Sequence, residues 1–311
     1  MADWAPLCAL TLDVALGWPA WLHACLGHPV GSFARMIDGC TRRFNQPQRS
    51  DAVRRWLGAL TMVIVAGGTF AMVWAMDCFV RRWLGPAVWP IMALLAWPAL
   101  AQRSLDEHYL PIITKLETGD LTAARETVGM IVGRDTSELD SSGIARAAIE
   151  SLAESFCDGV VAPLFWFVAL GLPGLWACKA INTADSLIGH KEVPFTDFGM
   201  VAARTDDVMN LIPARLSAIL ICLAGCGGWQ VLWRDHGNHA SPNAGWPEAA
   251  MAGALGVSLA GPASYDGILL EKPWIGSGEA PGLQAMARAR QVYHRACGLL
   301  WIGTGVAVWA L

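Results

Sequence analysis

Residues 148–178 read AIESLAESFCDGVVAPLFWFVALGLPGLWAC, and this stretch decides the fold. Its first part places Glu150, Glu154 and Asp158 four residues apart, on one face of a helix. Its second part, residues 159–178, carries no charge and is long enough to cross a bilayer as a helix. Because acidic groups repel each other at this spacing and are costly beside hydrocarbon, we expect the three carboxylates to serve a function.

The apolar part of this stretch is interrupted by helix-breaking residues. Pro163, Gly171, Pro173 and Gly174 lie within it. Breaks at membrane depth are tolerated where protein or a cavity surrounds the freed backbone groups. We therefore predict a broken or re-entrant segment over residues 159–178. A re-entrant segment would return the flanking polar stretches, residues 102–158 and 179–215, to one side of the membrane.

The composition is that of a polytopic membrane protein. Of the 311 residues, 54% are hydrophobic and 15% are charged, whereas soluble domains average about 25% charged residues. The net charge of −4 and the lack of a basic stripe give no sign of a nucleic-acid partner. We predict an all-α protein, embedded in a lipid bilayer as a single domain over residues 1–311.

We expect four or five membrane spans. The clearest are residues 58–76 and 216–233, and residues 7–26 and 85–101 are apolar stretches that polar residues or prolines interrupt. The polar segment over residues 102–158 should be helical, with a final helix capped by Ser141 or Ser142. A short loop before the second apolar stretch carries five arginines, which indicates a cytoplasmic loop: Arg42, Arg43, Arg49, Arg54 and Arg55.

The polar segments carry the residue types that bind Mg²⁺ and phosphate. Carboxylate oxygens suit Mg²⁺, and arginines suit phosphate or carboxylate groups. Asn182 and Asp185 lie within an otherwise apolar helical pattern, which favours a functional role. The spacing of Arg146 with Glu150 is also that of an ordinary ion pair on a helix surface, and the same holds for Arg204 with Asp207.

Two nucleotide-binding motifs and a metal motif are weak or missing. The sequence has neither GxxxxGK[ST] nor a GxGxxG that opens a helix after a strand. His236 and His239 form an HxxH pattern with no cysteine or carboxylate close by in the sequence, so we interpret them as part of an exposed loop. Spacing alone therefore predicts a membrane protein with a polar site rich in carboxylates and arginines.

Five blocks of sequence resemble one family, the adenosylcobinamide-phosphate synthases of cobalamin biosynthesis. They follow the family's order over nearly the whole chain: LDVALGWPAWLHACLGHPVGSFARMID (12–38), GRDTSELDSSGIARAAIESLAESFCDGVVAPLFWFVALGLPG (133–174), KAINTADSLIGHKEVPFTDFGMVAARTDDVMNLIPARLSA (179–218), SPNAGWPEAAMAGALGVSLAGPASYDG (241–267) and KPWIG (272–276). One departure lies at residues 154–159, where relatives usually read ENTVDG and this chain has Ser155 in place of the Asn. Any role of that Asn does not carry over.

The resemblance implies an amide-forming ligase in the cytoplasmic (inner) membrane with its active site facing the cytoplasm. Its substrates would be adenosylcobyric acid and (R)-1-amino-2-propanol phosphate, or the free amino alcohol. ATP and Mg²⁺ are the implied co-reactants, because a carboxylate oxygen is a poor leaving group and phosphorylation would supply a good one. Other membrane enzymes of cobalamin assembly are implied partners.

The resemblance also implies roles for individual residues. The expected catalytic residues are Glu150, Glu154, Asp158 and Asp185. Those expected to bind substrate or phosphate are Asn182, Arg204, Arg215 and Asn243. Those expected to hold the metal ion are Glu154, Asp158, Asp206 and Asp207.

Two other functions compete with this interpretation. A related membrane family includes a regulator tied to β-lactamase induction, which would make the chain a sensor. A transporter could use the carboxylates and the broken segment as a substrate site within the membrane, but the sequence has no inverted internal repeat.

Overall fold

The computed structural model describes residues 3–190, 192–265 and 267–310. The chain forms two compact units, which are described one at a time. Unit 1 takes its residues from 1–101, 162–210 and 304–311, and unit 2 from 102–161 and 211–303. The single membrane domain expected from the sequence stays a prediction.

Among its described residues, unit 1 contains helices and the loops that join them, and no strands. Its main helices are α1 (Ala5–Leu16), α2 (Ala20–Leu26), α3 (Pro29–Phe44), α4 (Asp51–Met62), α5 (Gly68–Leu84), α6 (Trp89–Ala96), α10 (Ala162–Ile188) and α11 (Met200–Met209). Short π- or 3₁₀-turns join some of them: η1 (Val63–Gly67), η2 (Gly85–Val88) and η3 (Trp97–Ala99).

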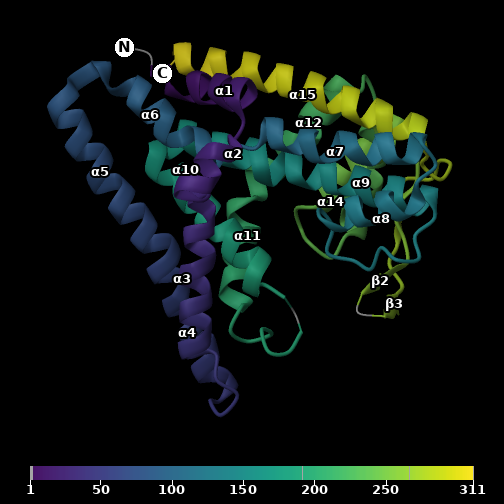
Figure 1. The fold of residues 1–311 in the computed structure, drawn as a ribbon, viewed down its shortest axis with the longest axis horizontal. Coiled ribbons are helices and arrows are strands. Elements are labelled where there is room, and N and C mark those ends of the chain that lie inside the picture. Colours follow the sequence, from purple (N-terminus) through teal and green to yellow (C-terminus); the bar gives the residue numbers. More distant parts are fainter. Residues whose placement is uncertain (1–2, 191, 266, 311) are drawn as a thin grey trace. The chain divides into compact units, whose positions relative to one another are not determined.

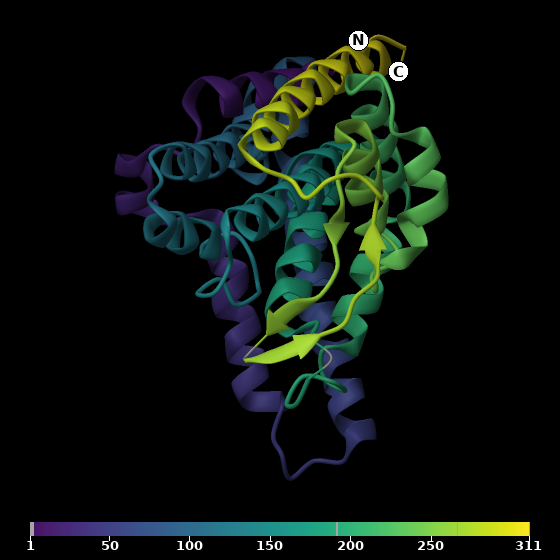
Figure 2. The ribbon, with the colours of Figure 1, turned by 90° about the vertical axis from the view of Figure 1, so that its right-hand side faces the viewer.

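Unit 2 combines helices with two small strand pairs. Its helices are α7 (Gln102–Glu117), α8 (Leu121–Gly129), α9 (Ser141–Phe156), η4 (Cys157–Val161), α12 (Leu211–Ala224), α13 (Trp229–Asp235), η5 (His236–Asn238), α14 (Gly245–Leu255) and most of α15 (Leu283–Ala310). Figure 2 shows the antiparallel pairs, β1 (Leu259–Ala260) with β4 (Trp274–Ile275) and β2 (Ala263–Tyr265) with β3 (Ile268–Leu270).

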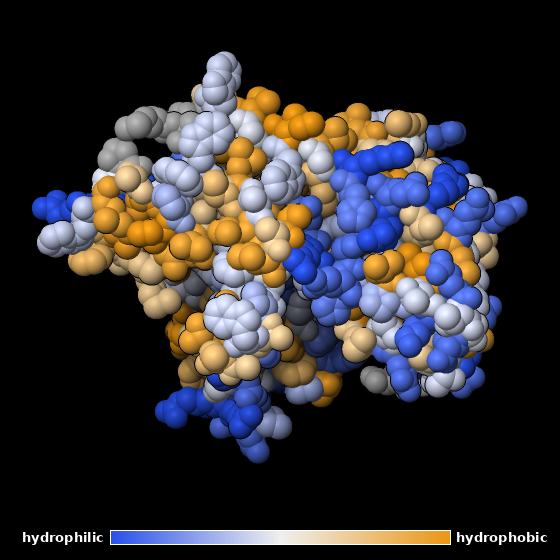
Figure 3. Space-filling view, turned by 45° about the horizontal axis from the view of Figure 1, so that its top comes forward, coloured by the Kyte–Doolittle hydropathy of each residue, from blue (hydrophilic) through white to orange (hydrophobic). Residues whose placement is uncertain are grey.

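Within the described residues, two helices are long and apolar enough to cross a membrane, Asp51–Leu84 and Ser141–Ile188. The count rises to four if each of two bent helix pairs forms one span. The predicted all-α membrane fold is therefore confirmed. Large apolar side chains of the first span face outward, among them Trp56, Met72 and Trp83. On the face drawn in Figure 3, apolar side chains cover broad areas and hydrophilic ones gather in separate regions.

The predicted break in residues 159–178 is confirmed. Gly171 has φ 70° and ψ −163°, which interrupts the helical backbone inside α10. This region of backbone space is essentially open to glycine alone. The turn that precedes α10 is the π-helical η4, which begins directly after α9. The acidic face of α9 is thus followed by an irregular turn and then by a broken apolar helix.

The predicted span over residues 216–233 is wrong in its extent. Helix α12 ends at Ala224, and a separate short helix, α13, begins at Trp229. The sequence GCGG at residues 225–228 lies between them. Glycine is a poor helix former, so a run of three within four residues ends the helix although the apolar composition continues.

The arginine-rich loop contacts the segment that follows α10 in unit 1. Helices α3 and α4 run side by side and are joined by residues 45–50 (Figure 1). The side chain of Asn45 donates to the carbonyl of Pro194 at 3.1 Å, and Arg55 pairs with Asp197 at 2.7 Å. The two loops therefore lie at the same end of this unit.

The core of unit 2 is built around α9. Phe156 packs edge-on against Tyr293, with ring centroids 5.7 Å apart. The hydroxyl of Tyr109 donates to the carbonyl of Met286 at 3.2 Å. Asp140 caps the start of α9 by accepting from the backbone N–H of Gly143, so the cap lies one residue before the predicted Ser141 or Ser142. These contacts fix the helix that carries Glu150 and Glu154.

Candidate functional site

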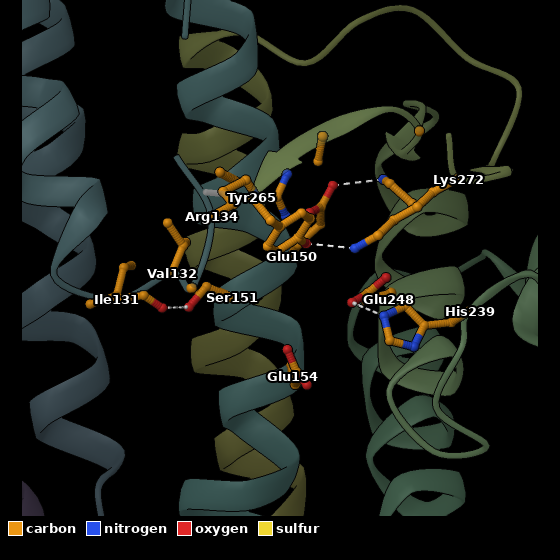
Figure 4. A pocket seen from close by; sticks show the side chains of 15 residues that line it. Ile131, Val132, Arg134, Glu150, Ser151, Glu154, His239, Glu248, Tyr265 and Lys272 are labelled. Carbon is orange, nitrogen blue, oxygen red and sulfur yellow. Dashed lines mark hydrogen bonds and ion pairs between the residues drawn. The ribbon is translucent and has the colours of Figure 1, made fainter. Parts of the chain in front are cut away.

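A polar cavity of about 180 Å³ lies within unit 2, and we call it the Glu154 cavity. Its walls come from the loop before α9, from α9, from α14 and from the strand region (Figure 4). The charged or titratable side chains that line it are Arg134, Glu150, Glu154, His239, Glu248, Tyr265 and Lys272. Three carboxylates and two permanent cations therefore face one small space.

Glu150 is buried and tied to two other elements. Its Oε2 forms an ion pair with Arg134, and its Oε1 accepts from the backbone N–H of Ala260 at 2.6 Å. Ala260 has a positive φ of 57°, a conformation that costs a non-glycine residue about 1–2 kcal/mol. This strained residue aims its N–H at the carboxylate. The buried charge of Glu150 is thus paired and hydrogen-bonded, as a buried charge must be.

Glu248 and His239 form a second pair on the opposite wall. His239 Nε2 lies 3.8 Å from Glu248 Oε1, and His239 Nδ1 accepts from the backbone N–H of Ser241 at 3.0 Å. Burial, followed by the charges of Glu150 and Glu154, raises the pKa of Glu248 well above its usual value. Burial and the nearby Lys272 lower the pKa of His239. Both shifts favour the neutral form of each group.

The remaining two charged groups differ from these in their surroundings. Lys272 is half-buried, and its Nζ donates to the hydroxyl of Tyr265 at 2.5 Å. Glu154 lies one helical turn after Glu150 and is exposed. Figure 4 shows Glu154 on the side of α9 that faces His239 and Glu248. The three carboxylates therefore have three environments: ion-paired, buried and exposed.

Two local features hold the loops that carry these residues. Asp135 accepts from the Ser264 hydroxyl at 3.0 Å and from the backbone N–H of Gly267 at 2.8 Å, which ties the Arg134 loop to the β2–β3 pair. At Gly261 a Cβ atom would lie 2.7 Å from ring atoms of Trp274. Glycine is therefore required at this position, directly after β1, where the backbone passes over that ring.

The structure brings Glu150 and Glu154 of the predicted set to this cavity. Asp158 follows one turn later in η4 and is outside its lining. Glu150 pairs with Arg134 and not with Arg146, so the ordinary ion pair considered for Arg146 and Glu150 is not formed. The catalytic roles of these residues stay predictions.

Five other predicted residues lie in unit 1. Asn182 and Asp185 are on the last turns of α10, and α11, which packs against α10, carries Arg204, Asp206 and Asp207. Arg204 is largely exposed and lies 3.8 Å from Asp207, the surface-pair arrangement considered above. The Asp206 carboxylate accepts from the side-chain amide of Asn210 at 2.9 Å.

Arg215 and Asn243 lie together in unit 2, outside the lining of the Glu154 cavity. Arg215 Nη1 donates to Asn243 Oδ1 at 3.1 Å, and its guanidinium lies 4.5 Å from the ring centroid of Trp246. Asn243 is buried. Their contacts with each other make a structural pair, and their predicted role in substrate binding stays a prediction.

Four residues of the cavity were missed by the sequence analysis: Arg134, His239, Glu248 and Lys272. The interpretation of His239 as part of an exposed loop is wrong, because its side chain is three-quarters buried and lies beside Glu248. The signal was available for three of them, because Arg134 stands inside the resembling block at residues 133–174. Glu248 and Lys272 stand inside the resembling blocks at residues 241–267 and 272–276, but neither has a partner at helical spacing.

The predicted metal residues are divided between the units, with Glu154 and Asp158 in unit 2 and Asp206 and Asp207 in unit 1. Among the residues that the structure describes, no group of three His, Cys, Asp or Glu side chains has the arrangement of a metal site. The metal assignment stays a prediction.

Comparisons with known proteins show the family to which the chain is similar. Residues 6–293 match a family model described as CobD/Cbib protein. The cobalamin biosynthesis protein CobD of Rhodobacter capsulatus is 45% identical, over 97% of this chain and 97% of its own length. Proteins of the same name from Rhizobium meliloti strain 1021 and Klebsiella pneumoniae subsp. pneumoniae are 42% and 37% identical, over 94% and 96% of this chain and 92% and 93% of their own lengths. No solved structure matches. The chain belongs to the CobD/Cbib family of cobalamin biosynthesis proteins.

Proposed function

We propose that this membrane protein joins the propionate carboxylate of adenosylcobyric acid to aminopropanol phosphate, or to the free amino alcohol, in an ATP- and Mg²⁺-dependent amide synthesis. The observation that carries the proposal is the convergence of three sequence blocks on one cavity. Arg134 and Glu154 come from the block at residues 133–174, Glu248 from that at 241–267 and Lys272 from that at 272–276. These blocks carry the resemblance to the synthases.

The size of the Glu154 cavity supports a limited contact with the corrinoid. Pockets that enclose a drug-sized molecule measure roughly 300–1,000 Å³, whereas this cavity measures about 180 Å³. It accepts the reacting groups, a propionate arm and a small amine, and the corrin ring stays outside. A substrate that offers one arm to a narrow cavity is consistent with amide formation at the end of that arm.

The donor set fits Mg²⁺ and phosphate. Mg²⁺ commonly uses one or two carboxylates together with water and substrate phosphates, so it needs no preformed cluster of three protein ligands. Glu154 supplies an exposed carboxylate, and Arg134 and Lys272 supply cations for phosphate oxygens. Bound Mg²⁺–ATP would supply the phosphoryl group that turns the propionate oxygen into a leaving group.

The residues of the cavity would carry out proton transfer, charge stabilisation and positioning. Glu154, the exposed carboxylate, takes a proton from the attacking ammonium and so frees its lone pair. Lys272 and Arg134 stabilise negative charge that develops on oxygen as the carbon–nitrogen bond forms. Glu150 keeps Arg134 in place through their ion pair. His239 and Glu248 close the opposite wall as neutral groups.

We also propose that the active site faces the cytoplasm. The arginine-rich loop predicts the cytoplasmic side by the positive-inside rule. In unit 1, Arg55, one of its five arginines, lies in the first turns of α4 and pairs with Asp197. Residues 192–199, which follow the block NTADSLIGH (182–190) at the end of α10, would therefore be cytoplasmic as well.

A direct assay tests the reaction. Purified full-length protein in lipid nanodiscs is mixed with adenosylcobyric acid, aminopropanol phosphate and Mg²⁺–ATP, and the amide is sought by mass spectrometry. We expect product that requires all three components, and a parallel reaction with the free amino alcohol shows which amine is preferred. Folded protein that yields no amide with either amine would reject the proposal.

A further inference from the structure

A second cavity lies in unit 2, beside the first turns of α9, and we call it the Arg146 cavity. Its volume is about 400 Å³. It is lined by Ser142, Arg146, Ser258, Trp274, Gly276, Ser277, Ala280 and Pro281. It shares no lining residue with the Glu154 cavity. The function proposed above makes no use of it.

Arg146 forms no ion pair with any carboxylate among the described residues. Its Nε atom is buried and has no hydrogen-bond partner among the described residues. The carboxylate that helical spacing would offer it, Glu150, is taken by Arg134. The lining of the Arg146 cavity contains no carboxylate. A part-buried guanidinium left in this state is costly, because buried donors are normally paired.

The guanidinium is held in position by an aromatic ring. Its central carbon lies 5.0 Å from the ring centroid of Trp274, a cation–π contact. Trp274 itself is fixed, because β4 pairs with β1 and the ring packs against Gly261. Trp274 therefore restrains the guanidinium and leaves its N–H groups, which are directed along the guanidinium plane, to bind an acceptor.

Two hydroxyl groups line the same space without a partner in the described part of the chain. Neither Ser142 nor Ser277 forms a side-chain hydrogen bond there, whereas Ser258 already donates to the carbonyl of Gly278. The N-terminus of α9 adds few backbone N–H donors to this cavity, because Asp140 caps the helix by accepting from Gly143. The donors that converge are thus one guanidinium and two hydroxyls.

We propose that the Arg146 cavity binds the phosphate group of a small organic phosphate ester. Several donors from different directions suit the tetrahedral oxygens of phosphate better than the two coplanar oxygens of a carboxylate. The cavity is larger than a phosphate ion needs and falls within the size range of small-molecule sites, so the phosphate belongs to a larger molecule. The inference rests on the proposed function only for the choice of two probes, ATP and aminopropanol phosphate.

Equilibrium dialysis with the full-length protein in nanodiscs tests this site. The probes are ATP without added metal, aminopropanol phosphate and inorganic phosphate, and the unphosphorylated counterparts are adenosine and aminopropanol. We expect at least one ester to bind more tightly than inorganic phosphate and than its own unphosphorylated counterpart. Whichever ester binds more tightly identifies the source of the phosphate.

Two variants locate the binding. Arg146→Gln removes the cation, and Ser277→Asp adds a carboxylate at an exposed position that tolerates it. Each should weaken ester binding at least about tenfold, since a charge-assisted hydrogen bond is lost or blocked. The matched controls Arg42→Gln and Ser50→Asp, at exposed sites in unit 1, should bind as wild type.

The outcomes separate this inference from the proposed function. Ester binding that is unchanged in both variants, or no preference for phosphorylated probes, would overturn the inference even if the amide forms. A protein that binds the ester through Arg146 but makes no amide would reject the proposed reaction and leave the phosphate site standing.

Discussion

Glu154 is the exposed member of the three carboxylates in the Glu154 cavity, and the role proposed for it depends on this exposure. Glu150 is committed to Arg134 and Ala260, and burial favours the protonated form of Glu248. A base toward an ammonium group, or a Mg²⁺ ligand, must be a carboxylate that the substrate or the ion can reach.

The first prediction follows from this difference. Glu154→Gln keeps the size of the side chain and removes its charge, so amide synthesis should fall at least about a hundredfold, the lower range for general acid–base catalysis. Corrinoid binding and membrane insertion should persist. The control Glu107→Gln, an exposed residue on α7, should keep wild-type turnover. Wild-type rates from Glu154→Gln would remove this residue from the catalytic set.

The raised pKa of Glu248 predicts how the stability of the folded protein depends on pH. Its pKa in the folded protein lies well above the usual 4.5, mainly because of burial. Between 4.5 and that raised pKa, the folded state keeps a proton that the unfolded state has lost, so stability falls as pH rises. His239 acts in the opposite sense, because its pKa is lowered from 6.5 and stability rises with pH through that window.

Comparing Glu248→Gln with the wild type isolates the contribution of the acid, since both proteins keep His239. Thermal unfolding in detergent, measured over a series of pH values, should show the variant gaining stability relative to wild type as pH rises above 4.5. Glu107→Gln, which changes an exposed carboxylate, should show no such trend. A difference between variant and wild type that is the same at every pH would contradict the raised pKa.

The residues of the site could be predicted from the sequence only where helical spacing relates them. Glu150 and Glu154 share a face of α9 and were found in that way. Arg134 and Lys272 reach the same cavity from a loop and from the segment after β3, and no periodic pattern relates these positions. Helical spacing even offered the wrong partner for Glu150, because the ion pair forms with Arg134 across a loop.

At the scale of elements, the sequence predicted helices well and their ends less well. The polar segment at residues 102–158 is helical as expected, and the break in residues 159–178 falls at one of the four predicted residues, Gly171. The predicted span at 216–233 failed because its hydropathy continues past the glycines that end α12. Hydropathy reports burial in lipid or protein, whereas helix ends depend on local backbone preference.

The break in α10 gives an element-scale prediction. Gly171→Ala places a Cβ at φ 70° and ψ −163°, which should cost about 1–3 kcal/mol and lower the midpoint of thermal unfolding. Gly298→Ala is a matched control, because this glycine lies inside the regular helix α15, its φ is not positive and an added Cβ meets no atom within 4 Å. That control should be neutral or slightly stabilising. Equal stability of Gly171→Ala and wild type would show that the break is not a fixed feature of α10.

At the scale of the whole molecule, the predicted metal site requires both units. Glu154 and Asp158 belong to unit 2, and Asp206 and Asp207 belong to unit 1. The sequence suggests their convergence because both polar stretches flank the broken segment, and the cytoplasmic side is predicted for both. In unit 1, Asp206 accepts from the side-chain amide of Asn210, and Asp207 lies 3.8 Å from Arg204.

Binding of Mn²⁺ in place of Mg²⁺ tests this convergence. Electron paramagnetic resonance distinguishes free from bound Mn²⁺, so the affinity of the full-length protein can be titrated without nucleotide. If one ion is shared, Glu154→Gln and Asp207→Asn should each weaken the same site at least about tenfold, because even outer-shell partners of a metal are worth that much. The controls Glu107→Gln in unit 2 and Asp38→Asn in unit 1 alter exposed carboxylates in helix-surface pairs and should leave affinity unchanged. A loss confined to the Glu154 variant would place the ion in unit 2 alone, and the carboxylates of α11 would then need a separate role.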